Sequence, residues 1–320
     1  MAFTMHSHSG QFCPGHAKDQ LEDIIKHAIS LGYTTMGLTE HMPRTSLEDL
    51  YPEELDEPEA SLAALFPRHE AYLQEAQRLQ AKYAPQIHIL IGFEGEFPRP
   101  DAYATLVTRL AAHPAVDYFV GSLHHIGAVP IDYDAAYYAR AVASAGADGT
   151  DGTEEQAYAR YYDQQHAMLT ALRPRIVGHF DLVRLLSSSP ARDVRAEWPL
   201  VWSRIIRNLA FVAGYGGWLE CNSSALRKGL AEPYPGGAVA EEWVRLGGRF
   251  TLSDDSHGVA QVGTNYARAL DFLAGLGVES LWTLRREEAH PGVVGEGGKK
   301  ANIVEVEIPL ENVRAVVSKW

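Results

Sequence analysis

Strand-like and helix-like segments alternate along nearly the whole of this chain, and this alternation restricts its fold more than any other feature of the sequence. In residues 17–31 apolar side chains recur at the three- and four-residue spacing of a helix, and Gly32 supplies a stop before the apolar, strand-like segment 34–39. The same order then repeats, with helices expected at 67–84, 101–112, 154–172, 198–213, 238–246 and 265–276 and strands at 87–97, 117–123, 175–180, 217–221, 249–253 and 280–284. Repeated strand–helix units predict an α/β fold with a parallel sheet, and about seven or eight of them predict a barrel.

Three inserts interrupt the alternation, but none of them demands a second domain. Residues 43–66 are acidic and contain prolines, and residues 143–153 have the composition of a flexible loop. Residues 286–301 are rich in glycine and lysine and precede a final expected strand at 303–308. We therefore expect one domain over residues 1–320.

Composition limits the setting and the partners of the protein. The longest apolar segments are strand-sized, well short of the roughly 20 residues of a membrane span. His6 and His8 stand where a secretory signal would be apolar, and the two cysteines, Cys13 and Cys221, favour a reducing, cytoplasmic setting. The formal charge of −13 argues against a nucleic-acid partner, but an anionic substrate stays compatible with it because bound cations can dominate the field of a site. The sequence gives no indication of the oligomeric state.

Histidine and carboxylate side chains follow the ends of the expected strands. In an extended strand alternate side chains share a face, so His6 and His8 project to the same side. Further candidates follow later strands or, in one case, the first loop: His16, His41, Glu94, His124, His179, Asp255 and His257. Function gathers at the carboxyl ends of the strands in parallel barrels, and these residue types are the ligands of a polynuclear hydrolytic metal site.

Two pairs of candidates require a choice between near neighbours. Glu94 and Glu96 face the same side of a strand, and Glu94 is favoured because it lies nearer the apolar run, with Glu96 as the fallback. His124 and His125 must point apart, and the spacing favours His124.

Two further pairs share a strand face. His179 is expected to be a ligand and Asp181 its orienting partner. Asp255 and His257 are both expected to be ligands, which leaves Asp254 in a supporting position.

Taken in order, these motifs resemble a known family. They are His-x-His with a following Phe-Cys-x-x-His, then Glu-His, Gly-Phe-Glu, Gly-Ser-Leu-His-His, Gly-His-Phe-Asp-Leu, Glu-x-Asn-Ser and Asp-Ser-His. The set resembles the polymerase-and-histidinol-phosphatase (PHP) family, and within it the histidinol phosphatases of the histidine pathway. The resemblance covers about four-fifths of the chain, from His6 to His257, and departs from the family at the inserts 43–66 and 143–153 and at the extra Gly10-Gln11.

The resemblance implies a distorted (β/α)7 TIM-like barrel that holds two or three divalent metal ions. One ion would be bound by His6, His8, Glu94 and Asp255; Glu94 would bridge to a second, bound with His124 and His179; the third would be bound by His16, His41 and His257. Imidazole and carboxylate ligands suit zinc, manganese or iron alike.

The implied reaction is the hydrolysis of L-histidinol phosphate to L-histidinol and phosphate by a metal-bound hydroxide, in L-histidine biosynthesis. Asp255 and His257 would act through the metals, and Asp181 or a metal-bound water would protonate the leaving alkoxide. Four residues are candidates for substrate contacts: Arg227 for the phosphate, Asn222 beside it, and Glu220 or Glu40 for the ammonium and imidazole groups.

Other functions remain as alternatives at this stage. A PHP-type phosphoesterase could act on a different small phosphate ester. A metal-dependent amidohydrolase also begins with His-x-His, but it usually needs a metal-bridging lysine, and no lysine occurs between Lys82 and Lys228. A nuclease would need a basic groove, and a structural zinc module is usually rich in cysteine.

Two phosphatase mechanisms with a protein nucleophile are disfavoured. Cys13 has no arginine six residues later, as a cysteine phosphatase would require. Asp132-Tyr133-Asp134 lacks the threonine that follows a phosphoaspartate nucleophile.

Overall fold

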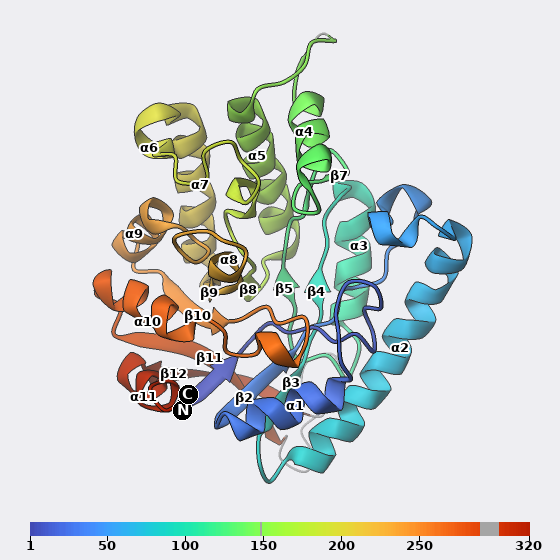
Figure 1. The fold of residues 1–320 in the computed structure, drawn as a ribbon, viewed down its shortest axis with the longest axis vertical. Coiled ribbons are helices and arrows are strands. Elements are labelled where there is room, and N and C mark those ends of the chain that lie inside the picture. The colour runs from blue at the N-terminus through green and yellow to red at the C-terminus, as the bar shows by residue number, and fades with distance from the viewer. Residues whose placement is uncertain (148, 289–300) are drawn as a thin grey trace.

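The computed structural model describes residues 1–147, 149–288 and 301–320, and it shows an α/β fold in which parallel strands lie inside a layer of helices (Figure 1). The parallel strands are β1 (Ala2–Thr4), β2 (Tyr33–Leu38), β3 (His88–Ile91), β4 (Glu94–Gly95), β5 (Val120–Gly121), β8 (Ile176–Val177), β9 (Trp218–Asn222) and β10 (Arg249–Ser253). Their side chains are almost entirely buried, as expected for strands covered on both faces.

These strands form two parallel sheets whose edges meet. One sheet has the order β1-β2-β3 and the other β10-β9-β8-β5-β4. At one junction Ser7 forms a parallel bridge with Ser256, just beyond β1 and β10. At the other, His41 bridges to Glu94, between the ends of β2 and β4. Backbone hydrogen bonds therefore connect the first and the last parallel strands of the chain.

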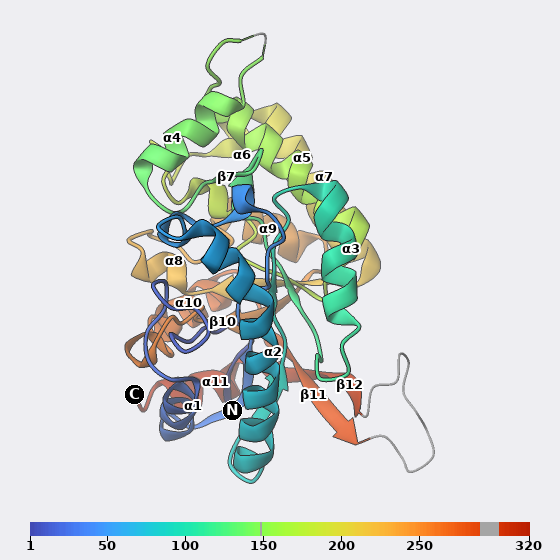
Figure 2. The ribbon, with the colours of Figure 1, turned by 90° about the vertical axis from the view of Figure 1, so that its right-hand side faces the viewer.

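Helices cover the outside of the strands (Figures 1 and 2). The longer ones are α1 (Leu21–Ser30), α2 (Pro58–Tyr83), α3 (Pro100–Ala111), α4 (Ala135–Ser144), α5 (Glu154–Leu172), α7 (Pro199–Tyr215), α9 (Gly237–Arg245), α10 (Tyr266–Gly275) and α11 (Leu310–Val317). Shorter turns are α6 (Val194–Glu197), α8 (Ser224–Arg227) and the 3-10 turns η1 (Leu47–Asp49), η2 (Pro52–Glu54), η3 (Leu182–Arg184) and η4 (Val259–Gln261). Among the described residues, no helix combines the length and the apolar character needed to cross a membrane.

The helical stripe predicted for residues 17–31 is confirmed in α1. Its apolar positions, from Leu21 to Ala28, are buried against the strands. The chain leaves the helix through Gly32, whose φ of +80° lies in the left-handed region that favours glycine.

The insert 43–66 is shorter than the sequence suggested, because α2 begins at Pro58 and not near 67. Pro67 lies inside this helix, and the buried stripe continues on its N-terminal side through Leu65. The remaining insert residues carry η1 and η2 and return to the carboxyl ends of the strands. Tertiary packing therefore carries the helix past a proline that would ordinarily interrupt it.

The other inserts also differ in part from expectation. Residues 145–153 connect α4 to α5, and α4 itself was not predicted; residue 148 lies outside the described residues. The expected insert 286–301 coincides at its ends with two strands, and residues 289–300 lie outside the described part of the chain.

The last two strands do not extend the parallel series. Residues 280–284 belong to β11 (Ser280–Glu288), which pairs antiparallel with β12 (Ala301–Pro309). Along β12, partly buried side chains are interspersed with exposed ones, so this ribbon has a solvated face (Figure 2). A second, shorter hairpin, β6 (His125–Ile126) with β7 (Val129–Pro130), follows β5.

Candidate metal centre

The carboxyl ends of the parallel strands bring histidines and carboxylates from distant parts of the sequence together. His6, His8 and Asp255 form one group that could hold a metal ion. In it the Nε2 atoms of His6 and His8 lie 3.7 and 3.4 Å from Oδ1 of Asp255. The pairing of the segments after β1 and β10 produces this group, because it places residue 8 beside residue 256.

A second group joins Glu94, His124 and His179. The Oε1 atom of Glu94 lies 3.2 Å from Nε2 of His124 and 3.0 Å from Nε2 of His179, and the two nitrogens are 3.1 Å apart. These residues follow or begin β4, β5 and β8, which are neighbours in the sheet.

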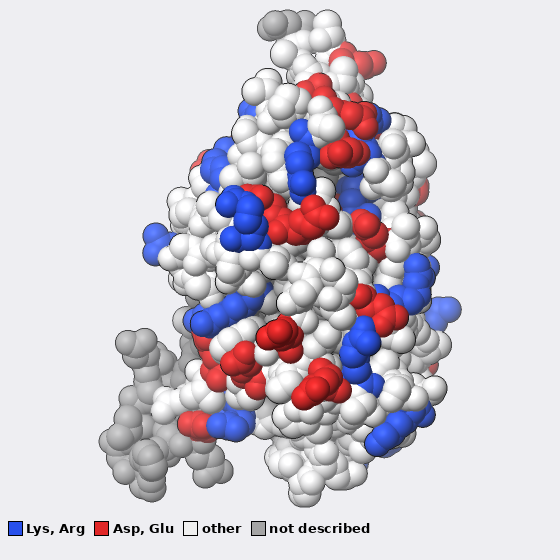
Figure 3. All heavy atoms as spheres, turned by 90° about the vertical axis from the view of Figure 1, so that its left-hand side faces the viewer, with Lys and Arg blue, Asp and Glu red and all other residues white. Residues whose placement is uncertain are grey.

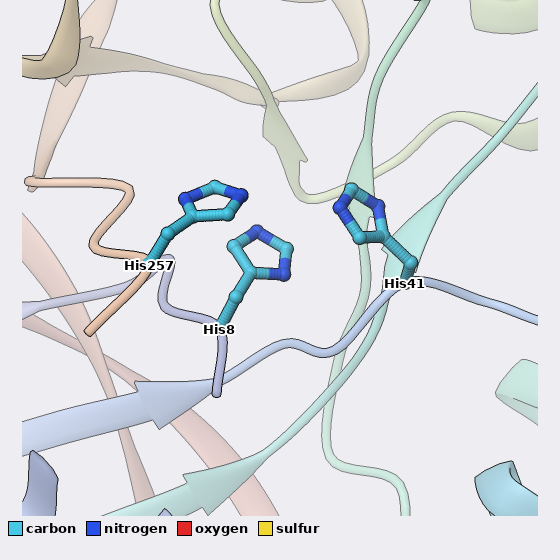
Figure 4. A group of neighbouring side chains, drawn as sticks. All are labelled: His8, His41 and His257. Carbon is cyan, nitrogen blue, oxygen red and sulfur yellow. The ribbon is translucent and has the colours of Figure 1, made fainter. Parts of the chain in front are cut away.

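A third group consists of His8, His41 and His257, which approach one another from three different segments (Figure 4). The ring of His8 lies 4.3 Å from that of His41 and 4.4 Å from that of His257, between ring centroids. A fourth group, His41 with Glu94 and Glu96, shares members with the others.

Glu94 connects the groups. Its carboxylate lies within 3.5 Å of imidazole nitrogens of five histidines, namely His6, His8, His41, His124 and His179. Glu96, the fallback for this position, instead contacts Nδ1 of His124 at 2.9 Å, on the side away from the second group. The geometry therefore gives Glu94 the shared position and Glu96 a supporting one.

The residues present fit divalent metal ions. Several buried imidazole nitrogens have no hydrogen-bond partner among the described residues, and they are Nε2 of His6, both nitrogens of His8 and His41, and Nε2 of His257. A buried nitrogen without a partner is costly, and a bound cation would satisfy it. No cysteine belongs to the groups, so nothing in the donor set selects zinc over manganese or iron.

The electrostatic setting differs among the proposed ligands. Burial alone would lower the pKa of His6, His41 and His124, but the neighbouring carboxylates more than offset it, raising the pKa of His41 to about 9 and those of His6 and His124 well above the usual value. A cation must therefore displace protons from these three rings. Burial and the neighbouring His41 lower the pKa of His8 to about 3, so its imidazole is neutral near pH 7. Burial alone would raise the pKa of Glu94, but the surrounding imidazoles, with His6 and His124 foremost, more than offset it and hold the pKa well below its usual value. A neutral imidazole and an ionised carboxylate are both ready to bind a cation.

Glu220 and Asn222, which we predicted to contact substrate, lie behind the site instead. Glu220 is fully buried, and its carboxylate accepts the Nδ1 proton of His6 at 3.0 Å. Asn222 is also fully buried, donates to Glu220, and accepts the backbone N–H of Ser224 at 2.8 Å. Neither is among the residues that line the mouth of the site, so in this structure both act as supports of the proposed ligands.

Arg227 is predicted to grip a phosphate, and in the structure its guanidinium is engaged by the backbone instead. Its guanidinium donates two hydrogen bonds of 3.0 Å to the backbone carbonyls of Asp254 and Asp255. The fork of donors thus fixes the turn that carries Asp255, while the next residue, Lys228, is exposed and lines the mouth.

Asp181 does not orient His179. One of its oxygens accepts hydrogen bonds from Nε of Arg184 at 2.9 Å and from the backbone N–H of Gly236 at 2.8 Å. The side chain lines a separate cavity of about 340 Å³ between α5, α7 and α9, and Nδ1 of His179 has no partner among the described residues. The predicted orienting and proton-donating role is therefore not supported by its position.

His16 and Glu40 lie at the edge of the centre. His16 is at the rim, its side chain 38% exposed, with Nδ1 3.0 Å from Glu53 and its ring 4.8 Å from that of His257. The expected group of His16, His41 and His257 thus has His8 in place of His16 in the structure. Glu40 accepts from the N–H and hydroxyl of Ser9, lines a neighbouring cavity together with His16 and His41, and has its pKa raised to about 7 by burial. It does not line the mouth, so it is not in position to contact substrate there.

The mouth itself is a cavity of about 50 Å³, and several of its residues were missed from the sequence. They are Tyr51, Glu53, Asp132, Tyr133 and Lys228. Tyr51 and Glu53 lie in the insert 43–66, whose acidic composition was the only signal. Asp132 and Tyr133 were considered only as a nucleophile motif. Loop residues of this kind carry no periodicity that would have placed them at the mouth.

Comparison with known proteins gives a consistent result. The sequence profile of the PHP domain family matches residues 4–224. A protein of Schizosaccharomyces pombe named "Probable histidinol-phosphatase" is 41% identical over 295 residues, which cover 92% of this chain and 93% of that protein. The "Histidinol-phosphatase" of Saccharomyces cerevisiae is 32% identical over 297 residues, with 84% and 87% covered.

Two solved structures have a similar fold. A putative histidinol phosphatase from Listeria monocytogenes gives a TM-score of 0.71 at 24% identity, with 83% of this chain and 99% of that chain covered. Histidinol phosphate phosphatase from Lactococcus lactis, solved with zinc, L-histidinol and phosphate, gives 0.62 at 19% identity, with 88% and 96% covered.

Proposed function

This chain belongs to the PHP family, and from that membership we propose that it is a metal-dependent histidinol-phosphatase, which hydrolyses L-histidinol phosphate to L-histidinol and phosphate. The observation that carries the proposal is the cluster of four overlapping ligand groups, two of which contain Glu94, at the carboxyl ends of the strands. The small, open mouth suits a phosphate monoester, and the step belongs to L-histidine biosynthesis in the cytoplasm.

We propose that the fold is a single-domain, distorted (β/α)7 barrel. Taking β3 and β4 as one interrupted strand, the order β1, β2, β3–β4, β5, β8, β9 and β10 forms a ring of seven. The bridges of Ser7 with Ser256 and of His41 with Glu94 support closure at the two junctions of the sheets.

The proposed ligand sets follow the geometry. His6, His8, Asp255 and Glu94 would hold one ion, and Glu94, His124 and His179 a second. His41 and His257 would hold a third, with His8 beside them and His16 at the rim. We expect two or three ions, of zinc, manganese or iron.

Bound divalent cations would offset the charge of the phosphate ester and acidify an attacking water. The side chains at the mouth would bind the substrate and orient it. Lys228 is the cation among the side chains that line the mouth, and its ammonium is placed to attract the phosphate. Glu53 and Asp132 also line the mouth, and their carboxylates suit the ammonium and imidazole of the substrate or the proton needed by the leaving oxygen.

One face of the surface carries charges of both signs. On the face drawn in Figure 3, acidic and basic side chains are interspersed, and neither sign forms a continuous patch among the described residues.

The test is hydrolysis by protein purified without chelator, with metal content measured on the same sample. We expect kcat/KM for L-histidinol phosphate to exceed that for other phosphomonoesters, and one ¹⁸O from labelled water to appear in the released phosphate. A higher kcat/KM for a different phosphate ester would overturn the assignment of L-histidinol phosphate as the substrate. Label in L-histidinol, or an acyl phosphate trapped on Asp132, would overturn the mechanism.

A further inference from the structure

The insert 43–66 reaches the candidate metal centre through one side chain, Tyr51. This residue precedes η2, and its hydroxyl donates a hydrogen bond to Oε1 of the fully buried Glu96. The other oxygen of Glu96, Oε2, lies 2.9 Å from Nδ1 of His124. A chain of contacts thus runs from the insert, through one carboxylate, to a proposed ligand.

In this series of contacts, each partner fixes the orientation of the next side chain. A carboxylate accepts hydrogen bonds, so Nδ1 of His124 donates to Glu96. In the neutral imidazole, Nε2, which faces Glu94 and His179, would then carry the lone pair that binds a cation. The Oε1 atom of Glu96 has a second neighbour, Nδ1 of His41, at 3.4 Å. The Tyr51 hydroxyl engages this oxygen and so keeps Glu96 directed at His124 and not at His41.

Tyr51 is itself firmly placed. The guanidinium of the buried Arg44 lies 4.1 Å from the centre of its ring. Arg44 forms an ion pair with Glu54, and the same carboxylate accepts the backbone N–H of Tyr51 at 2.8 Å. The Tyr51 ring also lies parallel to that of His125, at 6.2 Å and 9°. A side chain needed only to fill the rim would not require these contacts.

We propose that Tyr51 is a positioning residue, which through Glu96 holds His124 in the orientation and tautomer that bind the second metal ion. The proposal rests on the proposed metal centre. It gives the insert a role in metal affinity, separate from any contact with substrate.

The first test is Tyr51→Phe, which removes the hydroxyl and keeps the ring. Metal-free protein is titrated with Zn²⁺ against a chromophoric chelator, and the substrate is not needed. We expect one ion to bind about tenfold more weakly, at the lower end of the range for partners of metal ligands, while the other ions keep their affinity. At saturating metal, kcat should return to the wild-type value with KM unchanged.

A matched control separates this effect from a general loss of stability. Tyr215→Phe removes a hydroxyl that donates to the carbonyl of Pro174 at 3.0 Å, before the start of β8 and so at the opposite end of that strand. It should leave every metal affinity unchanged. If Tyr51→Phe lowers the free energy of unfolding in urea, a second variant is needed. Glu54→Gln keeps the Tyr51 hydroxyl but weakens the contacts that hold Tyr51 in place, and it should lower the affinity for the same ion to a smaller extent.

A double-mutant cycle tests the route through Glu96. Glu96→Gln should weaken the same ion by about ten- to a hundredfold, and adding Tyr51→Phe should then change its affinity by less than about twofold. If the two substitutions reduce the affinity independently, so that their fold-changes multiply in the double variant, the proposed route through Glu96 is overturned. If Tyr51→Phe binds every ion with wild-type affinity, the proposal itself is overturned. Because these titrations use Zn²⁺ alone, they stand apart from the outcome of the substrate test.

Discussion

Adjacent histidines in this protein face different surroundings, and the difference can be measured. His124 presents Nε2 to Glu94 and His179, whereas His125 lies against Tyr51, its Nδ1 4.0 Å from Glu96. Burial lowers the pKa of His125 to about 4. The alternation of side chains along a strand predicted which of the two points into the site.

We expect His124→Ala to lose one metal ion and more than about a hundredfold in kcat, because the loss of a direct ligand should exceed the effect of losing its supporting partner. His125→Ala should keep the full metal content. Metal analysis and kinetics of both variants check this. Equal metal loss in the two would contradict the assignment of His124.

Glu40 gives a prediction about pH. Burial raises its pKa in the folded protein to about 7 from an ordinary value of 4.5, so the folded state holds a proton that the unfolded state releases between these values. The free energy of unfolding should therefore fall as pH rises through that window. Glu40→Gln removes the titration, and between pH 5 and 7.5 its stability should rise relative to wild type by about 2 kcal/mol.

Urea unfolding of the two metal-free proteins at each pH measures this difference, since groups common to both cancel. A difference that stays constant with pH would show that Glu40 does not titrate in this range.

Residue identity predicted ligands better than it predicted supporting roles. His6 and His8, or Asp255 and His257, could be paired from sequence because strand geometry fixes their common face. The functions of Glu220 and Arg227 could not be predicted from the sequence. A polar side chain near the end of a strand can face the mouth, or it can bind a neighbouring group, as Glu220 binds Nδ1 of His6 and Arg227 binds the carbonyl of Asp254. Only tertiary packing decides between these arrangements.

Among the elements, the C-terminal end of α8 carries two cations with different surroundings. Arg227 is engaged with the carbonyls of Asp254 and Asp255, and Lys228 is exposed at the mouth. We expect Lys228→Ala to raise KM for L-histidinol phosphate about tenfold, with metal content unchanged, because about 1.4 kcal/mol of attraction to the phosphate is lost.

Arg227→Ala should have the opposite profile. Two buried carbonyls lose their donors, and the turn that positions Asp255 loosens, so metal content and kcat should fall by more than KM rises. Steady-state kinetics with metal analysis separate the two variants. A larger KM effect for Arg227→Ala than for Lys228→Ala would restore the arginine as the phosphate contact.

Element order was predictable, whereas several boundaries were not. α1 followed from its apolar spacing and glycine stop. β5 and β8 are only two residues long, far shorter than the strands expected at 117–123 and 175–180. α4 was missed, since its alanine-rich sequence has only a short buried side, formed by Tyr138 and Ala141.

At the scale of the whole molecule, the metal centre lies at the carboxyl ends of the strands, and the apolar core beneath it contains none of the proposed metal ligands. The strands are packed by fully buried apolar side chains such as Phe3, Ile91 and Leu219. We therefore expect chelation to abolish activity without unfolding the protein. At free metal one hundred times Kd, each ion should add about 2.7 kcal/mol to the free energy of unfolding.

Circular dichroism and urea unfolding, with and without chelator, measure this, and Mn²⁺, Zn²⁺ or Fe²⁺ should restore activity. A chelated protein with unchanged stability and activity would contradict a metal centre at this mouth.

The bridge between Ser7 and Ser256 also sets an order on how the site is completed during synthesis. A growing chain contains Glu94, His124 and His179 once residue 179 has left the ribosome, so this group can assemble early. The groups that include His6 and His8 must wait for Asp255 and His257, nearly 250 residues later. Until then His6 and His8 lack Asp255, so the group that these three residues form is completed only near the end of synthesis.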